Sequence, residues 1–431
     1  MHHVIAVLAT LDTKGAEAQF LRERIEALGS KALLIDIGVV GKPGARPDVT
    51  REEVAKAGGS SLAQLLVDPT RAAASPVMVA GATKVLLDLF HLHGTHGARL
   101  PHDSHGTHDV HGVHAVIGLG GTQGTSNCTA VMQALPYGFP KVMVSTVASG
   151  DVSAFVGIKD VTMMFSVGDL LGLNPVTRRI LANAAGAAHG MALAGGGIEM
   201  RRGGKPTIGI SNLGVLTDGT MLAIELLRQR GYESIVFHAV GSGGRAMEQM
   251  MKEGLIGAVL DYAMGEIADD VFHGLRAGGP ERMTVAGDLG LPQVIVPGGA
   301  EHIGLVVEAN TVPARWKSHK HVFHNPIIFA PRLSASELEQ VGHEAVRRLS
   351  RTKGDATLML PLRGVSRYSV PGGPLHDPAG DRAFFAALKT GLPKGIEVVE
   401  IDAGAEDPAF VRAMVEKLVA LVERKSATLA R

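Results

Sequence analysis

The sequence predicts an α/β fold with two similarly built domains, near residues 1–201 and 202–431, mainly parallel sheets and a cleft between the domains. Three observations support this prediction. Short apolar runs alternate with helix-compatible segments, which is typical of βαβ units. The strand–turn–helix–strand order at the start of the chain recurs from Lys205 onward. A chain of 431 residues is also too long for one ordinary hydrophobic core.

Composition narrows the classes of partner. The chain has 42 Lys plus Arg and 42 Asp plus Glu, so no overall field attracts nucleic acid or an anionic membrane. The single cysteine, Cys128, excludes an internal disulfide or Cys-based zinc site, and we expect it to be a small buried side chain. We find no apolar stretch of membrane-spanning length and no signal peptide, which predicts a cytoplasmic protein.

The first βαβ unit places polar residues at a strand end. A strand over Val4–Ala9 is followed by a polar turn, Thr10–Gly15, and then by a helix from Ala16. Open α/β sheets bind ligands at the carboxyl ends of their strands, so Asp12, Thr13 and Lys14 are nucleotide-binding candidates. Lys14 would neutralise a phosphate and Asp12 would orient Mg²⁺ through water. The alternative is that Asp12 or Thr13 only caps the helix.

The next glycine turn organises the first half. Ala115–Leu119 predicts a buried strand, and Ser126–Leu135 a helix. Glycines let a backbone approach a ligand closely, and a helix N-terminus offers free amides to an anion. The turn matches neither the P-loop nor a clean Gly-x-Gly-x-x-Gly, so a tight turn without a ligand is the alternative. The phosphate-binding candidates here are Gly120, Gly121, Thr122, Gly124 and Thr125.

A histidine-rich insertion precedes this turn. Residues 91–114 hold 8 of the 19 histidines, which recur at every third position from His105. Imidazole tracts bind zinc, nickel or copper. The interspersed glycines favour a solvated insertion, with metal binding as the alternative. Further along, Asn174 is placed to cap a helix beginning at Pro175.

The second half contains another glycine turn between a strand and a helix. The strand Ser234–Ala239 leads through Val240–Gly244 into a helix over Arg245–Glu253. A later polar loop carries Ser366. If this turn also holds an anion, the substrate-binding residues are Gly241, Gly243, Gly244, Arg245 and Ser366.

Carboxylates gather further along this half. Asp261 follows the predicted strand Ile256–Leu260. Three further carboxylates and a histidine follow with the spacing of one helix face, which suits acid–base chemistry or a divalent ion, although a solvated acidic face is the alternative. They are Glu266, Asp269, Asp270 and His273. The catalytic candidates are Glu248, Asp261 and His273; the sequence assigns no metal ligands.

Several motifs together resemble a known family. They are Thr10–Gly15, Gly118–Thr125, Ser145–Asp151, Phe237–Glu248 and Pro361–Ser366. Taken in this order, they resemble the Tm-one-like ATP-binding family, an uncharacterised and mainly microbial family related to the N-terminal region of the tomato mosaic virus resistance protein. The resemblance implies two Rossmann-like domains, a nucleotide site in the first and a homodimer. A TIM-barrel domain follows in the plant protein, so a separate TIM-barrel protein is an implied partner. The histidine-rich insertion departs from the family, which usually has a shorter connection there.

These observations lead to two functional hypotheses. The first is an ATP-binding cytosolic enzyme of small-organic-acid catabolism, with ATP and Mg²⁺ as cofactors and a small carboxylate as substrate. The second is a non-catalytic module, in which nucleotide binding controls the affinity for a protein partner. The sequence does not decide whether the protein is an enzyme.

Overall fold

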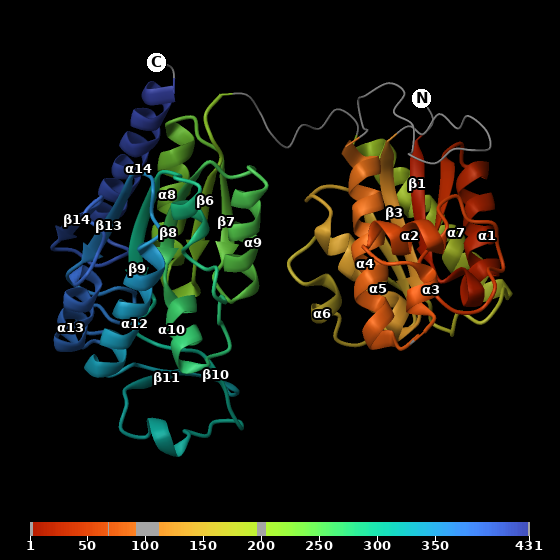
Figure 1. The fold of residues 1–431 in the computed structure, drawn as a ribbon. Coiled ribbons are helices and arrows are strands. Elements are labelled where there is room, and N and C mark those ends of the chain that lie inside the picture. The colour runs from red at the N-terminus through yellow and green to blue at the C-terminus, as the bar shows by residue number, and fades with distance from the viewer. Residues whose placement is uncertain (1–2, 68, 92–111, 196–203, 430–431) are drawn as a thin grey trace. The chain divides into compact units, whose positions relative to one another are not determined.

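The computed structural model describes residues 3–67, 69–91, 112–195 and 204–429. The chain divides into two compact units, Met1–Met200 and Arg201–Arg431, each of which is described by itself. Each unit has a parallel sheet with helices on both sides (Figure 1). The predicted α/β fold with two Rossmann-like domains is therefore confirmed.

The first unit has a five-stranded parallel sheet in the order β2-β1-β3-β4-β5. Its strands are β1 (Val4–Ala9), β2 (Lys31–Asp36), β3 (Val113–Gly120), β4 (Lys141–Ser145) and β5 (Thr162–Phe165). Its helices are α1 (Leu11–Ala27), α2 (Arg51–Ala57), α3 (Leu62–Leu65), α4 (Arg71–His91), α5 (Thr122–Ala134), α6 (Ser153–Val156) and α7 (Pro175–Ala194).

Alternate residues of β1 enter two different cores. Ile5 and Val7 pack with α1 and α7, whereas Ala6 and Leu8 pack with α4 and α5. This alternation is what a strand buried on both faces requires. Cys128 is buried in α5, as predicted, and burial raises the pKa of its thiol to about 12. The side-chain oxygen Oδ1 of Asn174 accepts the amides of Val176 and Thr177, so the predicted cap of α7 is also confirmed.

The second unit has a six-stranded parallel sheet in the order β14-β13-β9-β8-β6-β7. Its strands are β6 (Ile208–Asn212), β7 (Ser234–His238), β8 (Ala258–Ala263), β9 (Gln293–Gly298), β13 (Ala356–Pro361) and β14 (Ile396–Ile401). Its helices are α8 (Thr217–Gln229), α9 (Ser242–Lys252), α10 (Gly265–Phe272), α11 (Val285–Asp288), α12 (Ala335–Leu349), α13 (Pro378–Lys389) and α14 (Pro408–Leu429), with short 3₁₀ turns at Gly214–Leu216 and Ala314–Trp316.

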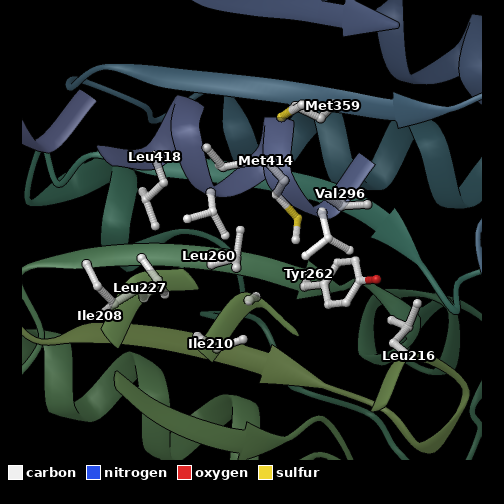
Figure 2. Packing of buried hydrophobic residues seen from close by; sticks show 14 of the residues in the cluster. Ile208, Ile210, Leu216, Leu227, Leu260, Tyr262, Val296, Met359, Met414 and Leu418 are labelled. Atoms are coloured by element: carbon white, nitrogen blue, oxygen red, sulfur yellow. The ribbon is translucent and has the colours of Figure 1, made fainter. Parts of the chain in front are cut away.

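Helix α14 covers one face of this sheet. Figure 2 shows Met414 and Leu418 of α14 against Leu260 of β8 and Val296 of β9, all of which are buried. The unit also carries a three-stranded antiparallel sheet that the sequence analysis did not predict, made of β10 (Leu305–Val306), β11 (His321–Asn325) and β12 (Ile328–Pro331).

Several helices begin earlier than predicted. Helix α1 begins at Leu11 and takes up the expected polar turn, with a non-helical backbone at Lys14. Helix α5 begins at Thr122 rather than Ser126. Short strand-to-helix connections are the norm in α/β units, so residues assigned to the turn become the first helical turn. Strand β8 extends to Ala263, which places Asp261 within the strand instead of after it.

The histidine-rich insertion near 91–114 lies mostly outside the described residues. His114 is described: it belongs to β3, and its Nδ1 accepts the amide of Val4 at 3.2 Å. Contrary to the expectation from the sequence, one helical stretch within the described part of the chain, Arg71–Phe90, has the length and hydropathy of a membrane span. Met78, Ala82 and Leu86 of that stretch lie in the core, as in an ordinary helix of a soluble α/β protein. The cytoplasmic location stays a prediction.

Candidate functional site

A cavity lies where the strand order of the first sheet reverses. The chain passes from β1 to β2 on one side and then returns to β3 on the other side of β1. Open α/β sheets bind ligands at such a switch point, outside the carboxyl ends of the strands. The cavity there has a volume of about 420 Å³, which suits a small molecule. Its walls come from the start of α1, the residues after β2, the start of α4 and the turn after β3.

Seven of the eight predicted nucleotide-binding residues line this one cavity: Asp12, Thr13, Lys14, Gly120, Gly121, Thr122 and Gly124. They come together because β1 and β3 are neighbours, with Leu8 opposite Gly118. Thr125 is the exception. Its side chain is fully buried, and its Oγ1 lies 2.7 Å from Ser145 Oγ, so its hydroxyl joins α5 to β4 instead of facing the cavity.

Two helices begin at the cavity without a side-chain cap. Thr10 precedes α1 and Gly121 precedes α5, and neither makes a capping hydrogen bond within the described residues. The amides of a first helical turn have no acceptor within their own helix. They also carry the positive end of the helix dipole. At α1 the amide of Leu11 donates to Asp36 Oδ1 at 3.1 Å, so the first-turn amides of α5 are the donors best suited to an anion.

In the turn after β3, Gly120 and Gly121 differ in whether the fold requires glycine at that position. A Cβ on Gly120 would lie 2.6 Å from the Cα of Gly124, so the close packing of β3 and α5 requires glycine there. Gly121 has a φ of −74°, and a Cβ there would come no closer than 3.7 Å to Thr146 Oγ1. The fold does not require glycine at position 121. Close approach of a ligand to the backbone would require glycine there.

The charged groups of the cavity differ from the prediction in one respect. Lys14 is buried, and its ammonium donates one of its three N–H groups to the carbonyl oxygen of Leu170, so only part of its donor capacity remains for a phosphate. Asp12 is half-buried in the first turn of α1, beside Gly38. Arg71, at the start of α4, is exposed on the cavity wall and makes no ion pair with a described residue.

Sequence reasoning missed part of the wall. Gly38–Val40 after β2, Arg71 and Gln123 all contribute to it. Gln123 Nε2 donates to Ser75 Oγ at 3.1 Å and to Asn127 Oδ1 at 2.9 Å, which joins α4 to α5. A signal for Gly38–Val40 was present, because the carboxyl end of β2 meets the same sheet edge as that of β1. Arg71 carried no such signal.

The second glycine turn is occupied by the protein itself. The amides of Gly241 and Gly244 donate to Glu266 Oε1 at 2.6 and 3.1 Å. Gly243 packs against the backbone of His238, and Arg245 is exposed with its Nε donating to the carbonyl oxygen of Gly241 at 3.3 Å. The expectation that these amides face a substrate is corrected: a buried carboxylate of the same chain already accepts them.

A carboxylate of the chain also accepts the first amides of α8. The amides of Asp218 and Gly219 donate to Glu406 Oε1 at 3.0 and 3.3 Å. The helix starts at the sheet edges therefore differ in what accepts their amides. Carboxylates of the chain accept the first amides at α8, at α9 and, through Leu11 and Asp36 Oδ1 at 3.1 Å, at α1, whereas α5 begins without a side-chain acceptor among the described residues.

Two catalytic candidates surround a fully buried arginine. Arg282 lies 2.5 Å from Asp261, 2.6 Å from Glu266 and 3.3 Å from Glu248. Burial raises the pKa of Glu248 to about 7, against the opposing effect of Arg282. Breaking a buried ion pair is strongly destabilising, so this network fixes the fold around α9 and α10.

His273 does not join this network. It is exposed at the C-cap of α10 with a left-handed backbone. The carboxylates predicted to share its helix face bind different arginines: Asp269 pairs with Arg276 at 2.7 Å, and Asp270 pairs with Arg348 at 3.0 Å. The predicted acid–base face is thus divided among separate ion pairs. Among the described residues, no group of three or more His, Cys, Asp or Glu is arranged to hold a metal ion.

Ser366, the remaining substrate-binding candidate, is fully buried. Its hydroxyl donates to Glu301 Oε1, and His302 Nδ1 lies 3.1 Å from the same oxygen. Although burial opposes it, His302 and the Ser366 hydrogen bond hold the pKa of Glu301 at about 2. Ser366 therefore stabilises a buried carboxylate and does not face a substrate in this structure.

The fold and the cavity define a class: a two-unit α/β protein with a ligand cavity at the carboxyl edge of its first sheet. Models of one protein family match both units of the chain. The N-terminal domain of the uncharacterised protein family UPF0261 matches residues 3–100 and 97–195, and its C-terminal domain matches residues 205–422. The chain belongs to this family.

Similar proteins occur in bacteria and in a plant. A UPF0261 protein of Clostridium tetani is 38% identical over 98% of this chain and 100% of its own length. A UPF0261 protein of Rhizobium meliloti is 34% identical over 95% of this chain and 97% of its own length. The ToMV resistance protein Tm-1 of Solanum lycopersicum is 31% identical over 69% of this chain and 40% of its own length. The predicted relationship to the tomato protein is therefore confirmed for part of the chain.

Proposed function

We propose that the first unit binds ATP in the cavity between the ends of β1 and β3. The observation that carries the proposal is the start of α5, which has no side-chain cap within the described residues and follows a glycine that the fold does not require. Anions bind at such helix starts because free amides and the helix dipole act together. The cavity volume of about 420 Å³ leaves room for a nucleotide.

Different lining residues would bind the phosphates and the Mg²⁺ ion. The first-turn amides of α5, at Thr122, Gln123 and Gly124, donate hydrogen bonds to the phosphate oxygens. Arg71 supplies a positive charge at the wall. Asp12 is the carboxylate suited to Mg²⁺, which proteins commonly hold through one or two carboxylates together with substrate phosphates.

ATP bound in this cavity would serve either catalysis or regulation. The first candidate is a cytoplasmic enzyme acting on a small organic acid, and the sequence resemblance implies a homodimer. The occupied glycine turn of the second unit favours the alternative, a nucleotide-dependent module that binds a protein partner such as a separate TIM-barrel protein. Incubation of the purified chain with Mg²⁺, ATP and candidate carboxylic acids separates the two, because only the enzyme consumes ATP as the acid is converted.

The binding proposal is tested by calorimetric titration of ATP in the presence of Mg²⁺. We expect Gly121→Ala to weaken binding by about tenfold or more, since a methyl group would lie between the ligand and the amides. Gly186→Ala is the matched control, because Gly186 is exposed on α7 and a Cβ there meets no atom within 4 Å. Equal ATP affinity in the wild type and in both variants would overturn the assignment of this cavity.

A further inference from the structure

A second cavity of about 310 Å³ lies in the first unit. It is formed by the connection after β2, by α2 and by α3, and it shares Val39 with the proposed nucleotide cavity. The lining residues used below are Lys42, Pro43, Pro47, Arg51, Leu62 and Leu66.

Arg51 lines this cavity and carries a buried donor without an acceptor in the described part of the chain. Its Nε donates to Asp36 Oδ2 at 3.0 Å, and its Nη1 donates to the carbonyl oxygens of Val40 and Gly41 at 2.9 and 3.2 Å. The side chain is only 4% exposed, and its Nη2 is buried without an acceptor among the described residues. Leaving a buried donor unsatisfied costs about 1–3 kcal/mol, and more for a charged group. A ligand oxygen would remove this cost.

The charged side chains around the cavity balance, so the preference for an oxyanion rests on the unsatisfied Arg51 donor and on Lys42. Asp36 lines it, but its Oδ1 already accepts the amides of Leu11 and Gly38, and its Oδ2 accepts from Arg51. Lys42 is exposed and forms no ion pair with a described residue. Glu52 is the opposing charge, exposed in the first turn of α2. Charge-assisted hydrogen bonds from a guanidinium to an oxyanion are about twice as strong as neutral ones.

We propose that this cavity is a binding site for a small molecule with a carboxylate or phosphate group. Arg51 Nη2 and the Lys42 ammonium hold the oxyanion. The apolar part of the molecule packs on Leu62 and Leu66, beside the two prolines; Leu66 is 47% exposed. The proposal concerns a separate cavity and does not depend on ATP binding.

The test uses the full chain with labelled leucine methyl groups, observed by NMR. The probes are isobutyrate, its neutral isostere isobutyramide, and inorganic phosphate. We expect isobutyrate or phosphate to shift the methyl signals of Leu62 and Leu66, and isobutyramide to leave them unchanged. A response to isobutyrate alone identifies a carboxylate site, and a response to phosphate alone a phosphate site. Equal shifts with isobutyramide, or no shift with either anion, would overturn the proposal.

Variants locate the binding. Arg51→Lys removes Nη2 but also breaks the contact with Asp36, so Lys42→Ala is the variant expected to keep the fold. We expect it to weaken binding of the responding anion by about fivefold to tenfold. Lys84→Ala, at an exposed lysine of α4, is the control and should bind as the wild type does. Unchanged affinity in Lys42→Ala would contradict the proposal. Binding should persist in Gly121→Ala, which separates this result from the fate of the ATP site.

Discussion

Glu248 shares one buried arginine with two other carboxylates, and its protonation therefore affects stability. Burial raises its pKa from the ordinary 4.5 to about 7, so between these values the folded chain binds its proton more tightly than the unfolded chain does. Its contribution to the free energy of unfolding must fall as pH rises through this window.

We expect Glu248→Gln to reveal this dependence. Below pH 4.5 the stability difference between variant and wild type should be constant, because Glu248 is protonated in both folded and unfolded chains. As pH rises to about 8 the variant should gain relative to the wild type by up to about 3 kcal/mol. Urea denaturation at a series of pH values measures this. A difference that does not change with pH would show that Glu248 does not titrate in this range.

Thr125 separates a structural from a ligand-binding role at one residue. Its buried hydroxyl contacts Ser145 Oγ, so Thr125→Val should lower the free energy of unfolding by about 1–2 kcal/mol. Its ATP affinity should equal that of the wild type, because the side chain does not line the cavity. Loss of ATP affinity with unchanged stability would restore the role that the sequence suggested.

At the scale of elements, the start of α5 links stability to binding with opposite signs. Gly121 has extended backbone angles that are usual for a helix N-cap, and serine is a better cap than glycine. Gly121→Ser should therefore stabilise the chain by a few tenths of a kcal/mol. It should also weaken ATP binding, because the serine oxygen accepts the amides that the phosphate needs.

Thermal unfolding and ATP titration of Gly121→Ser measure both effects, with Gly186→Ala again as the control for ATP binding alone. Raised stability together with unchanged ATP affinity would show that these amides do not hold the ligand.

The sequence predicted elements better than it predicted their contacts. Buried apolar runs such as Val4–Ala9 and Ala115–Leu119 identified strands, since few other structures fit them. The glycine turns at Gly120 and Gly241 looked alike, because nothing near Gly241 shows that Glu266 fills it. The destination of Lys14 and the pairing of α10 carboxylates with separate arginines likewise depend on residues distant in sequence. The antiparallel sheet was missed because its strands are short and partly exposed.

At the scale of the whole molecule, each unit has hydrophobic cores of its own. The clusters on the two faces of the first sheet contain residues of the first unit alone, and those of the second sheet contain residues of the second unit alone. Units with independent cores are expected to fold independently.

We therefore expect fragments 1–200 and 201–431 each to unfold cooperatively when expressed alone. ATP binding should stay with the first fragment, with an affinity close to that of the full chain, because every residue lining the cavity belongs to it. Circular dichroism during heating and calorimetric titration provide the measurements. Binding by the second fragment, or by neither folded fragment, would contradict this division of roles.

The central claim, that the open start of α5 holds the phosphates of ATP, is tested most directly by a crystal structure with Mg²⁺ and a non-hydrolysable ATP analogue. The account predicts phosphate oxygens within hydrogen-bonding distance of the amides of Thr122, Gln123 and Gly124. Phosphates bound at the turn of Gly241–Arg245 or elsewhere, with the cavity between β1 and β3 empty, would contradict it.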